Sequence, residues 1–154
     1  MDEKEKCGGF GVYGLKNASE LTYLGLFSLQ HRGQESAGIV ASDGKMVREK
    51  KGMGLVSEVF TSRDLKNLPG HIALGHVRYS TAGSSSPRNI QPFIGESRFG
   101  HLAIAHNGNL TNALALWKKL SERGAVFQSS TDTELILHLI AQSSFDGFED
   151  SLKD

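Results

Sequence analysis

Hydrophobic residues alternate with glycine near the start of the chain and then recur at helical spacing. Apolar residues and glycines alternate over 10–15, a pattern typical of a strand whose backbone lies close to another element. Apolar positions over 18–31 cover most of the circumference of a predicted helix, which we therefore expect to be buried on more than one side. Asn17 and Glu20 predict a capping box at the start of this helix, and Gly33 predicts its end.

Short apolar runs predict further strands in the middle of the chain. These strands are expected over residues 36–42, 45–50, 71–78 and 101–106. The pair Asp43-Gly44 predicts a hairpin between the first two. Residues 52–68 are expected to form a loop and a modest helix, and the polar stretch over 80–97 is expected to be a long loop.

Helical spacing dominates the last third of the chain. Apolar residues over 110–120 predict a helix that ends at Gly124, and Thr131 with Glu134 predicts a capping box that opens another. Residues 145–154 begin an amphipathic segment that stops without a capping residue, so we expect the chain to be a fragment. Strands and helices in hairpin-length steps favour an α+β layered sandwich over alternating βαβ units.

Composition narrows the class of protein. The 154 residues carry 17 basic and 17 acidic side chains, so no excess charge marks a surface for nucleic acid or anionic membranes. One cysteine excludes an internal disulfide, and six histidines lack the close spacing of a metal site, so we expect no metal in this chain. The start of the chain has no apolar signal segment. We expect a soluble, cytoplasmic protein.

The single cysteine, Cys7, directly follows the charged leader 1–6 and opens the first predicted strand. One interpretation is a small buried hydrophobe, which is the usual state of a free cysteine. The other is a nucleophile that removal of the leader would expose. We expect the leader to be disordered, because it has nothing apolar to bury.

Four polar clusters interrupt the apolar elements, each at the end of a predicted strand or helix, where active-site groups are often held. They cover residues 30–36, 75–83, 106–109 and 129–134. Each also has a simpler interpretation: Arg32 and Glu35 as a local ion pair, and Arg78 as a surface charge. Likewise Asn107-Gly108 could be only a turn, and Asp132 only a favourable charge at a helix start.

Taken together with Cys7, the clusters resemble the class II glutamine amidotransferases, whose nucleophile is the N-terminal residue, and most closely their amidophosphoribosyltransferase branch. The resemblance runs from residue 7 to about residue 141. It rests on Cys-Gly-Gly-Phe-Gly-Val at 7–12, Leu-Gln-His-Arg-Gly-Gln-Glu-Ser-Ala-Gly-Ile at 29–39, Gly-His-Val-Arg-Tyr-Ser-Thr-Ala-Gly-Ser-Ser-Ser at 75–86, His-Asn-Gly-Asn-Leu at 106–110 and Ser-Thr-Asp-Thr-Glu at 130–134. Five motifs in this order are highly specific.

This resemblance implies a four-layer αββα sandwich of the N-terminal-nucleophile hydrolase type, with two mainly antiparallel sheets between helix layers. It implies a propeptide at 1–6 and a partial glutamine amidotransferase domain over 7–154, incomplete at its C-terminal end. The implied reaction is hydrolysis of the glutamine side-chain amide. The ammonia would pass to phosphoribosyl pyrophosphate, forming 5-phosphoribosylamine in the first committed step of purine biosynthesis.

The family's functional residues carry over to matching positions here. Cys7 would be the nucleophile, and its own α-amino group, with an ordinary pKa of about 7.7–8.0, would take the thiol proton. Asn107 and Gly108 would form the oxyanion site. Arg78, assisted by Thr81, would bind the glutamine α-carboxylate, and a loop from Arg78 to about Arg88 would close over the site. Asp132 would accept from the α-ammonium.

The resemblance also implies partners that these residues do not hold. A phosphoribosyltransferase domain, with Mg²⁺ and phosphoribosyl pyrophosphate, would follow in the full-length enzyme, which is expected to be a homo-oligomer. No cofactor is expected in the chain itself. Two alternatives remain open: a sister amidotransferase with another acceptor, or a catalytically silent fragment.

Overall fold

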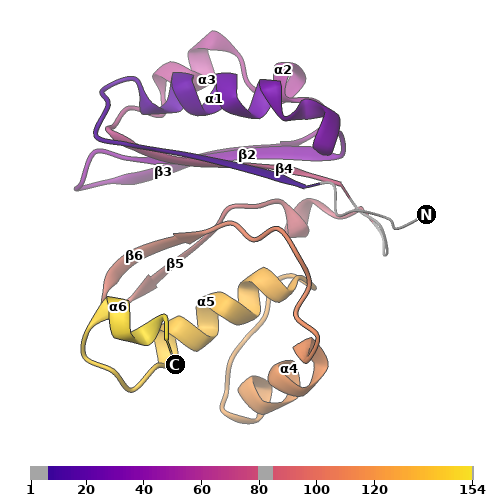
Figure 1. Ribbon diagram of the computed structural model, residues 1–154, viewed down its shortest axis with the longest axis vertical. Helices are drawn as coiled ribbons and strands as arrows, with labels where there is room; N and C mark the ends of the chain where they lie inside the picture. Colours follow the sequence, from indigo (N-terminus) through magenta and orange to yellow (C-terminus); the bar gives the residue numbers. More distant parts are fainter. Residues whose placement is uncertain (1–6, 80–84, 154) are drawn as a thin grey trace.

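Two β-sheets lie between two groups of helices in the computed structural model, which describes residues 7–79 and 85–153 (Figure 1). The larger sheet is antiparallel, and its strands in spatial order are β1 (Gly8–Tyr13), β4 (Ile72–Arg78), β2 (Ser36–Ser42) and β3 (Val47–Met53). The smaller sheet pairs β5 (Phe93–Ser97) with β6 (Gly100–Ile104). The leader 1–6 and Thr81 lie outside the described residues.

Helices cover the outer face of the larger sheet. They are α1 (Ala18–Ser28), the 3₁₀ turn η1 (Gln30–Arg32), α2 (Val56–Val59) and α3 (Ser62–Lys66). Helix α1 lies close against β4 because Gly75 has no side chain; a Cβ there would lie 2.6 Å from Thr22 and 2.7 Å from Leu26. The core under these helices is built mainly from small and branched side chains of the strands, including Ala37, Ile39, Ala41, Ala73 and Val77.

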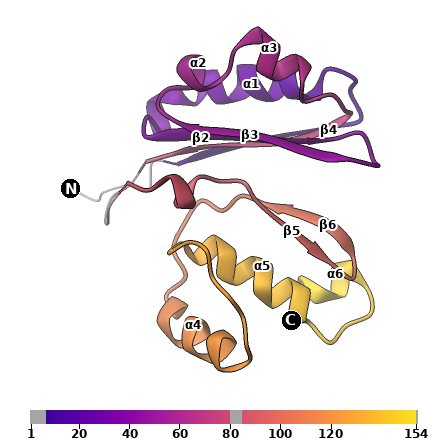
Figure 2. The same cartoon turned by 180° about the vertical axis from the view of Figure 1, so that it is seen from behind.

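A second group of helices covers the smaller sheet, as both views show (Figures 1 and 2). After the 3₁₀ turn η2 (Pro87–Asn89), the helices next to this sheet are α5 (Asp132–Gln142) and α6 (Phe148–Ser151), while α4 (Ala113–Glu122) lies farther from the sheet and packs against α5. Helix α5 packs on β5, where a Cβ at Gly95 would lie 2.9 Å from Leu137. The order helix, sheet, sheet, helix confirms the predicted αββα sandwich. No helix within 7–79 and 85–153 has the length and apolar character needed to cross a membrane.

The prediction that α1 is buried on several sides was wrong. Its buried residues are Ala18, Ser19, Thr22 and Leu26, a single narrow stripe. Leu24 and Phe27 are more than half exposed. The reason is that α1 packs against the larger sheet with one stripe only, so the apolar side chains on the rest of its circumference stay exposed.

The two predicted capping boxes do not form. Asn17 and Thr131 occupy the N-cap positions of α1 and α5, but neither side chain makes a capping hydrogen bond. Glu134 instead turns toward the preceding segment and accepts from the backbone N–H groups of Gln128 and Ser129. The carboxylate therefore stabilises the turn before α5 rather than the N-cap residue.

The polar stretch predicted as one loop contains structure. The turn η2 and strand β5 fall within residues 80–97, and β5 pairs in register with β6 from Phe93↔Ile104 to Ser97↔Gly100. The strand exists because of this pairing, which a local polar composition does not reveal.

The two layers meet closely at Gly38 of β2. A Cβ at this position would lie 2.1 Å from the carbonyl oxygen of Gln91, so only glycine lets the segment before β5 lie on the sheet. Gln91 in turn accepts a 2.7 Å hydrogen bond from the backbone N–H of His106 through its side-chain oxygen. These contacts set the separation of the two layers near the strand ends, where the polar clusters lie.

Candidate active site

Cys7 lies at the end of the larger sheet because β1 runs antiparallel to β4. Gly8, at the start of β1, pairs with Val77, near the end of β4, so Cys7 lies beside Arg78 and Tyr79. The thiol lies 3.6 Å from the backbone carbonyl of Tyr79, to which it can donate. The side chain is neither fully buried nor fully exposed, so Cys7 is not the small core hydrophobe of the simpler interpretation.

Two donors from different layers converge on the backbone carbonyl of Cys7. The side-chain amide of Asn107 donates to it at 3.0 Å, and the Nε–H of Arg32 donates at 2.9 Å. Asn107 follows β6 in the second layer, while Arg32 ends η1 in the first. The position of residue 7 is therefore held by both layers. The sequence suggested for Arg32 only a local ion pair with Glu35.

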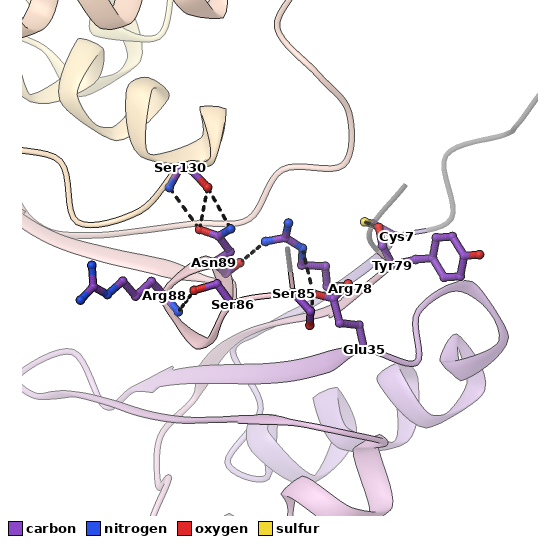
Figure 3. A network of polar contacts seen from close by, with 9 residues as sticks. All are labelled: Cys7, Glu35, Arg78, Tyr79, Ser85, Ser86, Arg88, Asn89 and Ser130. Atoms are coloured by element: carbon purple, nitrogen blue, oxygen red, sulfur yellow. Dashed lines mark hydrogen bonds and ion pairs between the residues drawn. The ribbon is translucent and has the colours of Figure 1, made fainter. Parts of the chain in front are cut away.

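Arg78, the last residue of β4, points away from Cys7 toward the second layer (Figure 3). Its Nη1–H donates to the backbone carbonyl of Asn89 at 2.8 Å, and its Nε lies 3.7 Å from Glu35. The ion pair of Glu35 is thus with Arg78 and not with the neighbouring Arg32. Both side chains of the pair are mostly buried, so Arg78 is not the surface charge of the simpler interpretation.

A glycine in the second motif permits this arrangement. A Cβ at Gly33 would lie 2.7–2.8 Å from backbone atoms of Val77 and Arg78. Glycine here lets the segment after η1 lie directly against the end of β4. The backbone of Glu35 is thereby held beside Arg78, since its own N–H donates to the Arg78 carbonyl at 3.1 Å.

Asp132, the first residue of α5, holds the segment that carries Asn107 and Gly108. Its carboxylate accepts from the backbone N–H of Leu110 at 2.7 Å and lies 3.5 Å from Nδ1 of His106. These contacts grip the segment on both sides of Asn107. Gly108 has φ of +151°, a conformation that L side chains rarely adopt, which explains glycine at this position.

His76 shapes the electrostatics beside Arg78. It lies two residues earlier on the same strand and is 1% exposed, and neither ring nitrogen has a hydrogen-bond partner among the described residues. Burial, assisted by the nearby charge of Arg78, lowers the pKa of His76 to about 4. At neutral pH the imidazole is therefore uncharged, so it adds no positive charge to that of Arg78.

Five of the six residues predicted for the site lie within the described chain, and a hydrogen bond joins two of them, Cys7 and Asn107. Cys7 contacts Asn107 directly, Asp132 holds the segment of Asn107 and Gly108, and Arg78 is next to Tyr79, whose carbonyl faces the thiol. Thr81, the sixth, is outside the described residues. Over 7–79 and 85–153, no group of His, Cys, Asp and Glu is gathered as a metal site.

Sequence reasoning missed Asn89 and Ser130. Asn89 is 5% exposed, and its side chain bonds to both the backbone and the hydroxyl of Ser130. It stands in a polar stretch with no periodic pattern, so nothing local signals its burial. Ser130 belongs to a motif of the predicted site, but no specific contact could be assigned to it.

Comparison with known proteins is consistent with this geometry. Residues 76–153 match the model of a glutamine amidotransferase domain. An amidophosphoribosyltransferase sequence of Lacticaseibacillus casei is 55% identical over 88% of this chain and 71% of its own length. The chain belongs to the amidophosphoribosyltransferase family.

Other members of the family are longer. Amidophosphoribosyltransferase 3 of Arabidopsis thaliana, a chloroplastic protein, is 56% identical over 90% of this chain, which spans only 26% of that relative. The amidophosphoribosyltransferase of Bacillus subtilis is 49% identical over 97% of this chain, which spans 32% of it. The chain therefore spans about a quarter to a third of the length of these curated relatives.

Solved structures of the family share the fold. A structure described as the allosteric regulatory enzyme of purine biosynthesis superposes with a TM-score of 0.89 at 49% identity, covering 94% of this chain and 31% of that one. The glutamine phosphoribosylpyrophosphate amidotransferase of B. subtilis, in complex with ADP and GMP, gives 0.86 at 47% identity, with the same coverage.

Proposed function

We propose that this chain hydrolyses the side-chain amide of glutamine and that the protein carrying it transfers the ammonia to phosphoribosyl pyrophosphate. The observation that carries the proposal is the hydrogen bond from the Asn107 amide to the Cys7 carbonyl at 3.0 Å, which joins a thiol residue to an amide donor from the other layer. Family membership supports the same reaction.

Cys7 is the proposed nucleophile. Its sulfur attacks the amide carbon of glutamine, and ammonia leaves as a thioester forms; water then hydrolyses the thioester to glutamate and restores the thiol. The proposed base is the α-amino group of Cys7 itself, after removal of residues 1–6. An ordinary cysteine with a pKa near 8.5 is only a few per cent thiolate at pH 7, so a base on the same residue raises the thiolate fraction during attack. The bonds from Arg32 and Asn107 hold the backbone of this residue in place.

Asn107 and Gly108 are the proposed oxyanion site. An amide nitrogen carries two N–H groups, and the bond to Cys7 orients the Asn107 side chain at the residue that would carry the tetrahedral intermediate. A preorganised donor of this kind stabilises the developing negative charge without rearrangement. The grip of Asp132 on Leu110 supports such preorganisation.

Arg78 and Asp132 are the proposed contacts for the α-carboxylate and the α-ammonium of glutamine, with Thr81 as an additional contact. A guanidinium favours carboxylates through paired hydrogen bonds. Glu35 and the Asn89 carbonyl fix the direction of Arg78, which favours a defined position for the carboxylate. A zwitterionic substrate matches this pair of opposite charges.

The acceptor half of the reaction is proposed from the family alone. Phosphoribosyl pyrophosphate and Mg²⁺ would bind outside these 154 residues. The cytoplasmic location is a proposal, since some relatives are chloroplastic proteins. The homo-oligomeric state of the full-length enzyme is likewise proposed from the family.

The test compares the full-length protein with its Cys7→Ala variant. The wild type is expected to release glutamate from glutamine, and its intact mass is expected to show a chain that begins at Cys7. The variant is expected to lose glutamine-dependent turnover while it retains formation of 5-phosphoribosylamine from added ammonia. Glutamate release by the variant would exclude Cys7 as nucleophile. A wild-type chain that keeps residues 1–6 and is active would exclude the α-amine as base.

A further inference from the structure

Asn89 is a buried polar residue, and three of its polar groups bond to Arg78 and Ser130. Its backbone carbonyl accepts from Nη1 of Arg78 at 2.8 Å. Its side-chain Oδ1 accepts from the backbone N–H of Ser130 at 3.1 Å, and its Nδ2 donates to the Ser130 hydroxyl at 3.0 Å. Figure 3 shows Asn89 between Arg78 on one side and Ser130 on the other. The residue thus joins two parts of the chain that belong to different layers.

Ser130, the residue that the Asn89 side chain binds, is close to Asp132 in the chain. Ser130 lies two residues before Asp132 and one before Thr131, the N-cap of α5. The start of α5 is therefore tied through the Asn89 side chain to the backbone carbonyl that holds Arg78. An amide buried without hydrogen-bond partners destabilises a fold, so an amide that is 5% exposed with both polar atoms paired favours a specific link over filling of space.

This link matters because the two proposed ends of the glutamine clamp come from separate layers. Arg78 ends β4 in the larger sheet, and Asp132 begins α5 on the outer side of the smaller one. Binding groups must hold a substrate within roughly 0.5 Å of the productive geometry, which layers that shift independently would not maintain. Of the hydrogen bonds described, those of Asn89 give the shortest route from Arg78 to the turn that precedes Asp132.

We propose that Asn89 is a positioning residue that sets the separation between Arg78 and Asp132, and that this separation selects the α-carboxylate and α-ammonium of an L-amino acid. The inference rests on the proposed glutamine hydrolysis. Asn89 acts through its neighbours and does not contact the substrate. Loss of the Asn89 side chain keeps the hydrogen bond from Arg78 to the Asn89 carbonyl but removes the bonds to Ser130. Residue 89, and Arg78 with it, is then no longer tied to the turn before α5.

The experiment measures hydrolysis of L-glutamine and D-glutamine by the full-length protein and its Asn89→Ala variant. Enantiomers differ only in how the carboxylate and ammonium are placed around one carbon, so their ratio reports the clamp geometry. We expect Asn89→Ala to raise KM for L-glutamine roughly tenfold, which is the scale of one or two hydrogen bonds. The preference for the L enantiomer should fall by a similar factor, while kcat and ammonia-dependent turnover stay near wild type.

Three further variants separate positioning from folding. Ser130→Ala removes only the hydroxyl partner and is expected to raise KM about threefold, and the double variant should be no worse than Asn89→Ala alone, because coupled residues are not additive. Glu96→Ala alters an exposed side chain of β5, the strand that follows this 3₁₀ turn, and should change neither KM nor the enantiomer ratio.

The possible results are distinguishable. An unchanged KM and enantiomer ratio in Asn89→Ala and Ser130→Ala would overturn the inference. So would an equal loss with both enantiomers accompanied by a lower melting temperature, since that pattern indicates a purely structural role. A wild-type protein without glutamine hydrolysis would instead defeat the proposed function on which the inference rests.

Discussion

The side-chain amide of Asn107 donates a 3.0 Å hydrogen bond to the backbone carbonyl of Cys7, and this bond joins the two layers of the sandwich at the strand ends. The two residues stand far apart in the sequence: Cys7 directly precedes β1 of one sheet, and Asn107 follows β6 of the other. Their contact depends on the close approach of the layers at Gly38 and on the grip of Asp132 on the Asn107 segment.

Replacement of Asn107 tests whether its amide stabilises the transition state. Asn107→Ala in the full-length protein is expected to lower kcat for glutamine hydrolysis about 10²–10³-fold with little change in KM, because loss of one oxyanion donor acts on the transition state. Steady-state release of glutamate measures this effect. Asn109→Ala, on the exposed side of the same segment, is the matched control and should remain near wild type. A loss of less than about fivefold in Asn107→Ala would contradict the assignment.

Asp132 has two roles that substitution can separate. Asp132→Asn keeps an oxygen that can accept from the Leu110 N–H but removes the negative charge. We expect this variant to raise KM for glutamine roughly 10–100-fold, the scale of a hydrogen bond to a charged group, with kcat changed much less. Asp132→Ala removes both functions and should lower kcat as well. Equal effects of the two variants on kcat would show that the charge, and not the grip on Leu110, holds the segment.

Gly38 limits the separation of the two layers. Gly38→Ala would place a Cβ 2.1 Å from the carbonyl oxygen of Gln91, so the free energy of unfolding should fall by roughly 1–3 kcal/mol. Activity should fall too, because Gln91 binds the backbone of His106 next to Asn107. Denaturant unfolding of the full-length protein measures the loss. Gly11→Ala is the control, since a Cβ there would meet nothing closer than 3.8 Å. Equal stability of the two variants would refute the steric argument.

His76 should make the fold sensitive to mild acid. Its pKa is about 4 in the folded chain and near 6.5 when unfolded, so between these values the unfolded state binds more protons. The free energy of unfolding therefore rises with pH. The stability that depends on a neutral His76 is fully present above about pH 6.5 and is lost as the pH falls toward 4, a change of about 3 kcal/mol.

Chemical denaturation of the full-length protein at pH 7 and pH 5 measures this dependence. His76→Gln should flatten it, because the variant has nothing to titrate there. His101→Gln removes an exposed histidine of β6 and should leave the slope unchanged. A slope that survives in His76→Gln would assign the acid sensitivity to other groups.

Local patterns predicted several elements because their cause is local. The apolar runs over 36–42 and 71–78 predicted β2 and β4, and helical spacing after Leu110 predicted α4 with its stop at Gly124. The burial of α1 was misjudged because the pattern identifies apolar residues but not how closely the sheet approaches. Strand β5 was missed because the stretch around it is largely polar and its pairing with β6 joins segments that no local pattern links.

The sequence by itself determined the family, the order of the elements and the residue types of the candidate site, since motifs and periodicity are properties of neighbouring residues. Only the tertiary structure decided which atoms meet: Arg32 with the Cys7 carbonyl, Glu35 with Arg78, and Asn89 with Ser130. Each of these contacts joins segments distant in the chain. The register of β1 on β4 and the separation of two layers set them, and no local pattern carries that information.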